Sequence, residues 1–192
     1  MARSKEFEEN EVLEKAMRLF WEQGYEKTSM SDLTDHMGIH RRSLYDTFGD
    51  KHSLFLKAMD RYGDKVSAAL TGEIKRSKSA KQALQIIFSF MILEDEETPP
   101  GCLMVNSAVE LAARDADVDS KSTRSFTLAE QLLKEIIVWG QRNGEFTLDK
   151  DAEELAEYLH NVWVGLRVMA RTSISEEKLR RIANTSMEFL EV

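Results

Sequence analysis

The residues best suited to chemistry lie between His40 and Thr47, in the sequence HRRSLYDT. If this stretch is helical, Leu44 and Phe48 lie one turn apart and face inward together. The side chains left outside carry two guanidiniums, a phenol and hydroxyls, which can hydrogen-bond to phosphates and base edges in a major groove. This pattern predicts a DNA-contacting surface formed by His40, Arg41, Arg42, Ser43, Tyr45 and Thr47.

The element that must position this helix comes directly before it. Ser29 and Asp32 have the spacing of a capping box, so a helix is expected to begin at Met30. Apolar residues follow at intervals of three and four as far as Met37, and Gly38 can take the left-handed conformation that ends many helices. Two short helices around a glycine-bearing break are typical of a helix-turn-helix.

Residues 12–59 resemble the N-terminal domain of the tetracycline-repressor (TetR) family of bacterial transcription regulators. The resemblance is carried by LFWEQGYEKTSM, then DLTDHMGI, then RRSLYDTFGDKHSLF, in this order. It implies that Arg41 and Arg42 contact bases or phosphates. It also implies backbone contacts from Thr28, Tyr45 and Lys51, and further groove contacts from Ser43 and Thr47.

Three of these positions have alternatives. Without the resemblance, Thr28 is equally well explained as a turn hydroxyl. Lys51 is explained as a solvated lysine, although a lysine at a helix N-terminus opposes the helix dipole unless an anion such as phosphate lies nearby. His40 stands where a serine or threonine is expected to cap the recognition helix, so the start of that helix is less firmly fixed.

Composition favours a soluble, all-α protein. Hydrophobic residues make up 42% of the 192 residues and charged residues 31%, and the two prolines stand together at positions 99 and 100. Alternating β-type runs are absent. We expect about nine helices, with a three-helix helix-turn-helix domain in residues 1–50 and a helical domain for effector binding and dimerisation in residues 51–192.

The net charge of −8 is unusual for a DNA-binding protein. Residues 24–51 contain four basic and five acidic side chains. We therefore expect modest affinity for DNA, a shallow dependence of this affinity on salt, and a need for two copies of the domain on one DNA site.

The ends and the apolar runs predict a cytoplasmic protein with no membrane partner. The N-terminus lacks the basic-then-apolar order of a signal peptide. The uncharged apolar run of residues 83–93 is too short to span a membrane. A single cysteine is consistent with a reducing compartment.

A seam of apolar residues with heptad-like spacing runs through residues 155–189. Its members repeat at intervals of three and four before and after a break at Ser173. This pattern is equally well explained by packing within one chain or by pairing with a second copy in a four-helix bundle. The resemblance implies the homodimer. The predicted interface residues are Leu155, Leu159, Val162, Leu166, Met169, Leu179, Ile182, Ser186 and Phe189.

Methionine and aromatic residues are frequent between residues 84 and 169. Each residue alone is better explained by core packing, but as a set they can line a cavity between helices. The resemblance implies a pocket for a small-molecule effector in this region. Its expected lining is Phe88, Met91, Met104, Phe126 and Trp163, with Asn106, His160 and Arg167 as inward-pointing polar groups.

Cys102 follows Pro-Pro-Gly at an expected helix start, where a lowered thiol pKa favours a sensor of oxidants or electrophiles. The acidic residues just upstream work against this, and a small buried hydrophobic residue is the better explanation. The four histidines lack metal-ligand spacing, and no glycine-rich phosphate loop occurs. We expect no metal, no cofactor and no enzymatic activity.

The expected function is a ligand-responsive repressor that binds a palindromic double-stranded operator as a homodimer and is released by a small-molecule effector. In the mechanism that the resemblance implies, the effector moves the helix after residue 50 and changes the spacing of two recognition helices. The alternative is a helical protein-interaction module that no longer binds DNA. The acidic composition is the best support for that alternative.

Overall fold

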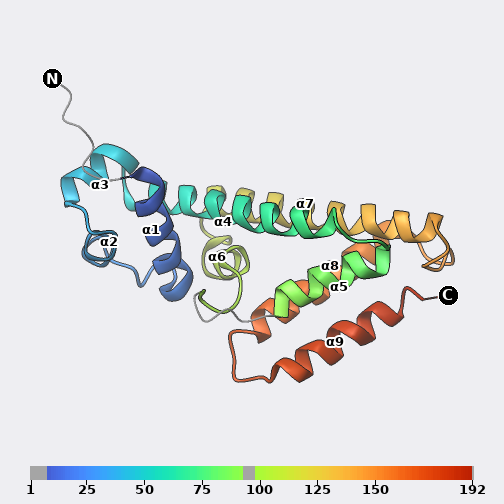
Figure 1. Cartoon of the computed structure of the whole chain (residues 1–192). Coiled ribbons are helices and arrows are strands. Elements are labelled where there is room, and N and C mark those ends of the chain that lie inside the picture. Colours follow the sequence, from blue (N-terminus) through green and yellow to red (C-terminus); the bar gives the residue numbers. More distant parts are fainter. Residues whose placement is uncertain (1–7, 93–97, 192) are drawn as a thin grey trace.

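The computed structural model describes residues 8–92 and 98–191, and within these ranges the chain forms nine α-helices and no β-strand (Figure 1). The all-α prediction is confirmed. The helices are α1 (Glu9–Gln23), α2 (Met30–Met37), α3 (Arg41–Phe48), α4 (Lys51–Ile74), α5 (Ala80–Ile92), α6 (Leu103–Leu111), α7 (Ala116–Arg142), α8 (Ala152–Met169) and α9 (Glu176–Glu188).

Helix ends follow local sequence signals. α7 begins at Ala116, because the Asp115 side chain accepts hydrogen bonds from two backbone N–H groups of the first turn. The aspartate-rich stretch DADVD, residues 115–119, is therefore mostly helical.

α1, α2 and α3 pack with the first half of α4 into a head at one end of the molecule (Figure 1). Their apolar stripes face one another as the spacing predicts, and each fully buried large side chain contributes about 1.5–3 kcal/mol relative to an exposed one. The core of the head includes Val12, Ala16, Phe20, Leu33, Met37, Leu44, Phe48, Leu54 and Phe55.

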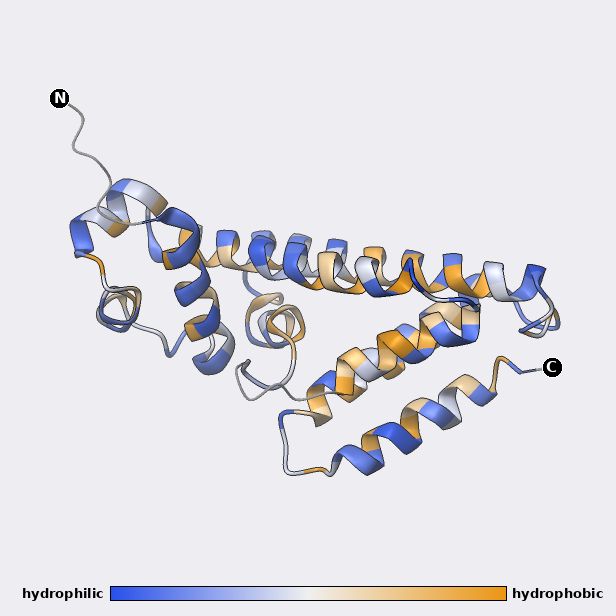
Figure 2. Cartoon of the chain, viewed as in Figure 1, coloured by the Kyte–Doolittle hydropathy of each residue, from blue (hydrophilic) through white to orange (hydrophobic). Residues whose placement is uncertain are grey.

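The rest of the chain forms an elongated helical body. α4 has 24 residues, about 36 Å at 1.5 Å per residue, and it continues from the head into the body beside α7 (Figure 1). α5 is apolar over most of its surface (Figure 2) and packs with α4, α7, α8 and α9, so it lies at the centre of the body.

α6 lies between the head and the body (Figure 1). Its residues Leu103, Met104 and Leu111 join the core of the head and not that of the body. Apolar packing is therefore continuous across the junction. The predicted domain boundary after residue 50 stays a prediction, and at that point α4 begins with its Asp50 cap.

Candidate nucleic-acid interface

The helix-turn-helix is held by the caps that the sequence predicts. The Ser29 hydroxyl accepts the N–H of Asp32 at 3.1 Å, and the Asp32 carboxylate accepts the N–H of Ser29 at 2.8 Å. These hydrogen bonds with Ser29 lower the pKa of Asp32. Gly38 ends α2 with a φ of 71°, which glycine adopts without strain. The predicted helix start at Met30 is confirmed.

α3 turns its polar side chains to solvent. The Arg42 side chain is 93% exposed, and its guanidinium lies 3.7 Å from the Asp46 carboxylate. Arg41 donates a hydrogen bond to the Tyr45 hydroxyl at 3.4 Å, and its guanidinium carbon lies 5.7 Å from the centre of the Tyr45 ring. Arg41 and Tyr45 thus form an outward-facing pair beside Arg42, which is the arrangement expected of a recognition helix.

The other three residues between His40 and Thr47 predicted to contact DNA lie in α3 or directly before it. His40 precedes the helix, is exposed and makes no side-chain cap hydrogen bond, as its departure from serine or threonine implied. Ser43 and Thr47 are partly buried on the same helix. Contacts of these three residues with DNA stay predictions.

Thr28 does not belong to the exposed surface. Its side chain is 0% exposed, and its hydroxyl donates a hydrogen bond to the Gly24 carbonyl at 2.6 Å. The predicted phosphate contact is therefore wrong, because a buried hydroxyl that is bonded within its own turn cannot reach DNA. Thr28 is the turn hydroxyl of the alternative explanation.

Lys51 opens α4 and is partly buried. Its ammonium lies 4.2 Å from the centre of the Tyr25 ring. A cation over an aromatic face gains roughly 0.5–1 kcal/mol at an exposed site, which offsets its unfavourable position at a helix N-terminus. The predicted contact of Lys51 with a phosphate stays a prediction.

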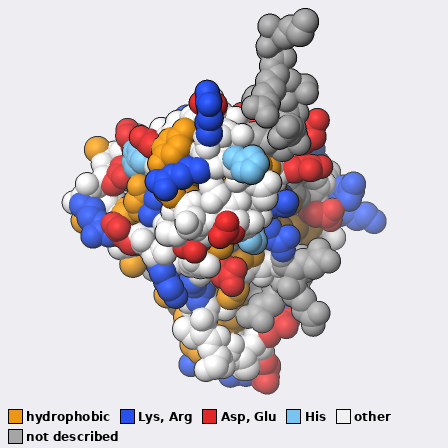
Figure 3. All heavy atoms as spheres, turned by 90° about the vertical axis from the view of Figure 1, so that its left-hand side faces the viewer, with side chains coloured by type: hydrophobic (Ala, Val, Ile, Leu, Met, Phe, Trp, Pro, Cys, Tyr) orange, Lys and Arg blue, Asp and Glu red, His pale blue; other side chains and the backbone are white. Residues whose placement is uncertain are grey.

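The surface of the head is mixed in charge. In the view that faces the head, lysine and arginine side chains alternate with aspartate and glutamate, and they do not merge into one basic surface (Figure 3). The net charge of −8 also weakens the attraction between the protein and DNA phosphates. Any affinity for DNA therefore depends on a few well-placed guanidiniums.

Two side chains from beyond the head hold the end of α1 and the turn after it. The Glu110 carboxylate, on α6, accepts hydrogen bonds from the backbone N–H groups of Tyr25 at 3.0 Å and Glu26 at 2.8 Å. The Arg171 guanidinium, just after α8, donates to two carbonyls in the last turn of α1 at 3.2 and 3.5 Å. Free backbone groups at this helix end are thus satisfied from across the junction.

Gly24 makes room for this contact. It has a φ of 84°, and a Cβ at this position would lie 2.8 Å from Glu110 Oε2. Arg114, one turn after Glu110, adds an ion pair with Glu26 at 3.1 Å. We call Glu110, Arg114 and Arg171, together with residues 21–26 that they hold, the junction clamp. Sequence reasoning missed it, because charged side chains on helices give no sign of a distant backbone partner.

A second polar link joins α4 to α7. His52 Nε2 lies 2.8 Å from Asp115 Oδ2. Burial raises the pKa of Asp115, but hydrogen bonds from the α7 backbone and from His52 outweigh burial and lower it. Asp117 approaches the same group, and possible ligand atoms of the three residues lie within 4.8 Å of one another. Both Asp115 oxygens already accept hydrogen bonds, so we treat the cluster as a structural link.

The predicted effector residues divide between two cores. Phe88 and Met91, on α5, are only 1% and 2% exposed and lie in the core of the body, where the core-packing alternative explains them. Phe126, His160 and Trp163 do come together. The ring centres of Phe126 and His160 are 5.4 Å apart, and those of His160 and Trp163 are 6.0 Å apart.

The polar members of the predicted set are buried at least in part. His160 Nδ1 lies 3.0 Å from Glu130 Oε1; burial lowers the pKa of His160, and Glu130 only partly opposes this. Arg167 Nη1 donates to the Met91 carbonyl at 2.8 Å. The side-chain amide nitrogen of Asn106 and Nε of Arg167 are buried without a partner in the described part of the chain.

Cys102 and Met104 lie on α6 close to α4. Cys102 is 9% exposed, which agrees with its explanation as a small buried hydrophobic residue. Burial and the neighbouring Cys102 raise the pKa of Tyr62, on α4, well above its ordinary value, whereas the Arg167 guanidinium opposes this. The Met104 methyl carbon would lie 3.8 Å from a Cβ built at Gly63, so α4 and α6 approach closely here.

Much of the predicted dimer seam lies in the chain's own core. A side chain that is at most 5% exposed has almost no surface left for a second subunit, so the assignment of these residues to a dimer interface is corrected. They are Leu155, Leu159, Leu166, Leu179 and Ser186. The remaining seam residues, Val162, Met169, Ile182 and Phe189, keep exposed surface.

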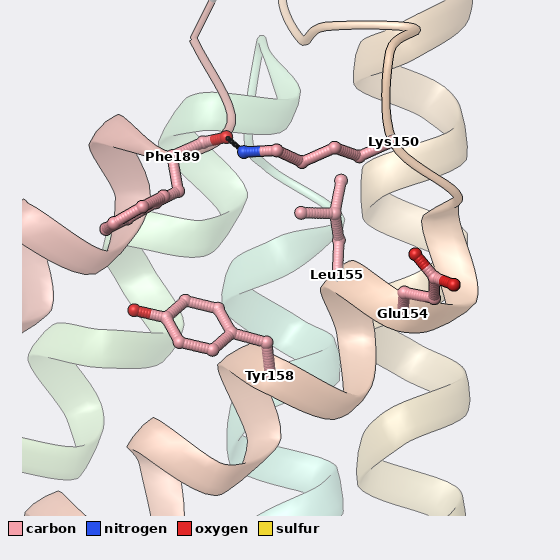
Figure 4. Close-up of a pocket in the computed structure, with 5 residues that line it drawn as sticks. All are labelled: Lys150, Glu154, Leu155, Tyr158 and Phe189. Carbon is pink, nitrogen blue, oxygen red and sulfur yellow. Dashed lines mark hydrogen bonds between the residues drawn. The ribbon is translucent and has the colours of Figure 1, made fainter.

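A pocket of about 270 Å³ opens between the start of α8 and the end of α9 (Figure 4). Lys150 Nζ donates to the Phe189 carbonyl at 3.3 Å, and the Tyr158 and Phe189 rings lie 5.7 Å apart. Glu154 and Leu155 complete its lining. None of the predicted effector residues lines this pocket, whereas Leu155 and Phe189 come from the predicted dimer seam.

Comparison with known families agrees with the fold and the helix-turn-helix. Residues 12–58 match the family model for bacterial regulatory proteins of the TetR family, and residues 80–186 match the model for the tetracyclin repressor-like C-terminal domain. The chain belongs to the TetR family of DNA-binding transcriptional regulators. Among the described residues, no helix has both the length and the apolar character needed to cross a membrane.

Individual relatives cover nearly the whole chain. The transcriptional repressor ComR of Escherichia coli K12 is 33% identical over an alignment of 188 positions that covers 96% of this chain and 90% of ComR. The regulator YezE of Bacillus subtilis 168 is 34% identical over an alignment of 197 positions that covers 100% of both chains. A cysteine mutant of the TetR family regulator CifR, solved with 26-bp double-strand operator DNA, has a TM-score of 0.88 and 27% identity, covering 98% of this chain and 100% of CifR.

Proposed function

We propose that this protein is a homodimeric cytoplasmic repressor, without catalytic activity, that binds a palindromic operator through α3 and is released by a small-molecule effector. The observation that carries the proposal is the outward-facing Arg41–Tyr45 pair beside Arg42, on a helix fixed by its caps. The repressor name of ComR and the operator complex of CifR support it.

The proposed dimer surface is the outer face of α8 and α9. Tyr158, Val168 and Phe189 are 42%, 48% and 53% exposed, although all three are large and apolar. Tyr158, Val162, Gly165 and Val168 lie at intervals of three and four on one side of α8, and the small Gly165 permits close approach of a second helix. A two-fold dimer through this face covers these side chains.

The proposed release route runs through α6. This helix contacts α7 and α8 of the body, and its Glu110 holds the turn that leads into α2. An effector that favours a shifted α6 therefore changes the orientation of the head. Two heads that no longer match the roughly 34–36 Å spacing of successive major grooves cannot engage both half-sites.

Fluorescence anisotropy with DNA from upstream of the gene, over a salt series, tests the proposal. We expect saturable binding that Arg41→Ala and Arg42→Ala weaken, whereas Arg142→Ala, an exposed arginine at the far end of α7, leaves it unchanged. Absence of binding at low salt would favour the protein-interaction module.

A further inference from the structure

Among the described residues, the Arg167 guanidinium has no anionic partner. Its Nη1 donates to the Met91 carbonyl, but Nε is buried without an acceptor among the described residues. No described carboxylate lies within ion-pair distance of it. Nε and Nη2 form the edge through which a guanidinium binds a carboxylate with two parallel hydrogen bonds. Arg167 is partly buried, and an anionic partner offsets the cost of taking a cation out of water, so this edge is suited to an anion.

Ser122 lies at the same level of the helix pair as Arg167. Glu130 of α7 faces His160 of α8 at 3.0 Å, and Lys134 pairs with Glu153 at 3.1 Å, so the two helices run antiparallel. Ser122 lies about two turns before Glu130, and Arg167 lies about two turns after His160. Ser122 and Arg167 are thus displaced by about two turns toward the same end of the α7–α8 pair, which places them at the same level.

The Ser122 hydroxyl adds an independent observation. Ser122 is only 2% exposed, and its Oγ has no hydrogen-bond partner in the described part of the chain. A buried hydroxyl without a partner costs about 1–3 kcal/mol. A ligand oxygen at this level would satisfy both Ser122 and Arg167.

All buried side-chain polar atoms without a partner in the described residues can donate hydrogen bonds. They are Trp21 Nε1, Asn106 Nδ2, Ser122 Oγ and Arg167 Nε, and three of them can only donate. The centres of the Trp21 and Tyr62 rings lie 4.9 Å apart, and Tyr62 neighbours Cys102, one turn before Asn106. The junction of α1, α4, α6 and α8 therefore has an excess of donors and calls for acceptors.

The next turn of the same helix pair is apolar. Phe126 lies one turn after Ser122, and Trp163 lies one turn before Arg167. Both rings contact the ring of His160, which is held neutral by burial at ordinary pH. A ligand that reaches Arg167 along these helices thus meets aromatic walls.

We propose that the effector is a small organic carboxylate whose carboxylate binds the Nε–Nη2 edge of Arg167 and the Ser122 hydroxyl, while its apolar body lies against Phe126 and Trp163. This inference rests on the proposed function, since it assigns the chemical class of the effector. The Arg167 carbonyl oxygen would lie 3.2 Å from a Cβ built at Gly101, so Arg167 lies beside the N-terminal end of α6, the helix whose other end carries Glu110. Binding and head orientation are thereby linked through one short helix.

Calorimetric titration of the full chain with benzoate, phenylacetate and hexanoate tests the class, with benzamide and benzylammonium as neutral and cationic controls. We expect at least one carboxylate to bind about tenfold or more tightly than both controls, and Arg167→Gln to remove this preference. Arg167→Lys keeps the positive charge but lacks the planar edge that donates two parallel hydrogen bonds, so it should weaken carboxylate binding. It serves as the test if Arg167→Gln lacks a cooperative melting transition. Ser122→Ala should weaken binding severalfold.

Two results would overturn the inference: no binding by any carboxylate of the panel, or equal binding of carboxylates and benzamide in the wild type. Operator binding by the same preparations is measured in parallel. Operator binding without a carboxylate response contradicts the effector class and leaves the regulator intact. Absence of operator binding contradicts the proposed function itself.

Discussion

Glu110 lies 85 residues beyond Tyr25 in the chain, yet its carboxylate accepts the Tyr25 backbone N–H at 3.0 Å. The same carboxylate accepts the N–H of Glu26, so one side chain of α6 holds two consecutive peptide groups. The Arg171 guanidinium, which is a cation, donates hydrogen bonds to the carbonyls of Trp21 and Glu22, just before this turn. The orientation of the helix-turn-helix therefore depends on groups that do not contact DNA.

Glu110→Gln should weaken operator binding without changing its salt slope. The amide presents an N–H₂ group to one of two backbone donors, and a lost hydrogen bond to a charged group costs about 1.5–3 kcal/mol. No phosphate contact is removed, so the number of released counterions stays the same. Asp64→Asn removes the same charge from an exposed position of α4 and serves as the control. Anisotropy titrations at several salt concentrations measure both quantities; a changed slope for Glu110→Gln would contradict a positioning role.

Thr28→Val should lower the free energy of unfolding, because it leaves the Gly24 carbonyl without its hydroxyl partner. A loss of about 1–3 kcal/mol is expected. Thr28→Ser keeps the hydroxyl and should retain much of that stability. Urea denaturation followed by circular dichroism measures the difference. If Thr28→Val were as stable as the wild type and bound DNA with a smaller salt slope, Thr28 would be a phosphate contact after all.

Val168→Asp should dissociate the dimer, since it places a charge on the apolar outer face of α8. Light scattering coupled to size exclusion should give the mass of one chain for this variant and of two chains for the wild type. Leu128→Asp changes a 61% exposed leucine on α7 and should leave the dimer intact. A wild-type chain that is monomeric at micromolar concentration would refute the proposed surface.

The free energy of unfolding should decrease as the pH is lowered through the titration range of His160. Burial lowers the pKa of His160 in the folded protein below its ordinary value of 6.5. The unfolded chain therefore binds the proton more readily, so this contribution to stability is complete above about pH 6.5 and declines as pH falls from there toward the folded pKa. Melting temperatures between pH 5 and 8 should fall less steeply for His160→Gln than for the wild type. Equal slopes would show that His160 is not held neutral.

Local signals in the sequence predicted the head well. The Ser29–Asp32 capping box and Gly38 act only on neighbouring residues, and each does what its spacing predicts. Leu44 and Phe48 face inward for the same local reason, so the exposure of Arg41 and Arg42 follows directly.

Long-range packing was harder to predict. The seam of Leu155, Leu159 and Leu166 has the spacing of a helix–helix contact, but spacing does not say whether the partner is the same chain or another. The Thr28 hydroxyl donates to the carbonyl of the residue four positions earlier. The sequence alone does not show whether such a hydroxyl bonds to the backbone or faces solvent, so the predicted phosphate contact is wrong. The junction clamp depends on residues far apart in the chain and left no local pattern.

The central claim is that two α3 helices of one dimer bind one operator. Anisotropy titration of the upstream palindrome, compared with the same DNA carrying one scrambled half-site, tests it most directly. We predict two chains per intact site and an affinity that falls about a hundredfold or more when one half is scrambled. Equal affinity for the intact and scrambled sites, or binding that Arg41→Ala and Arg42→Ala leave unchanged, would contradict the claim.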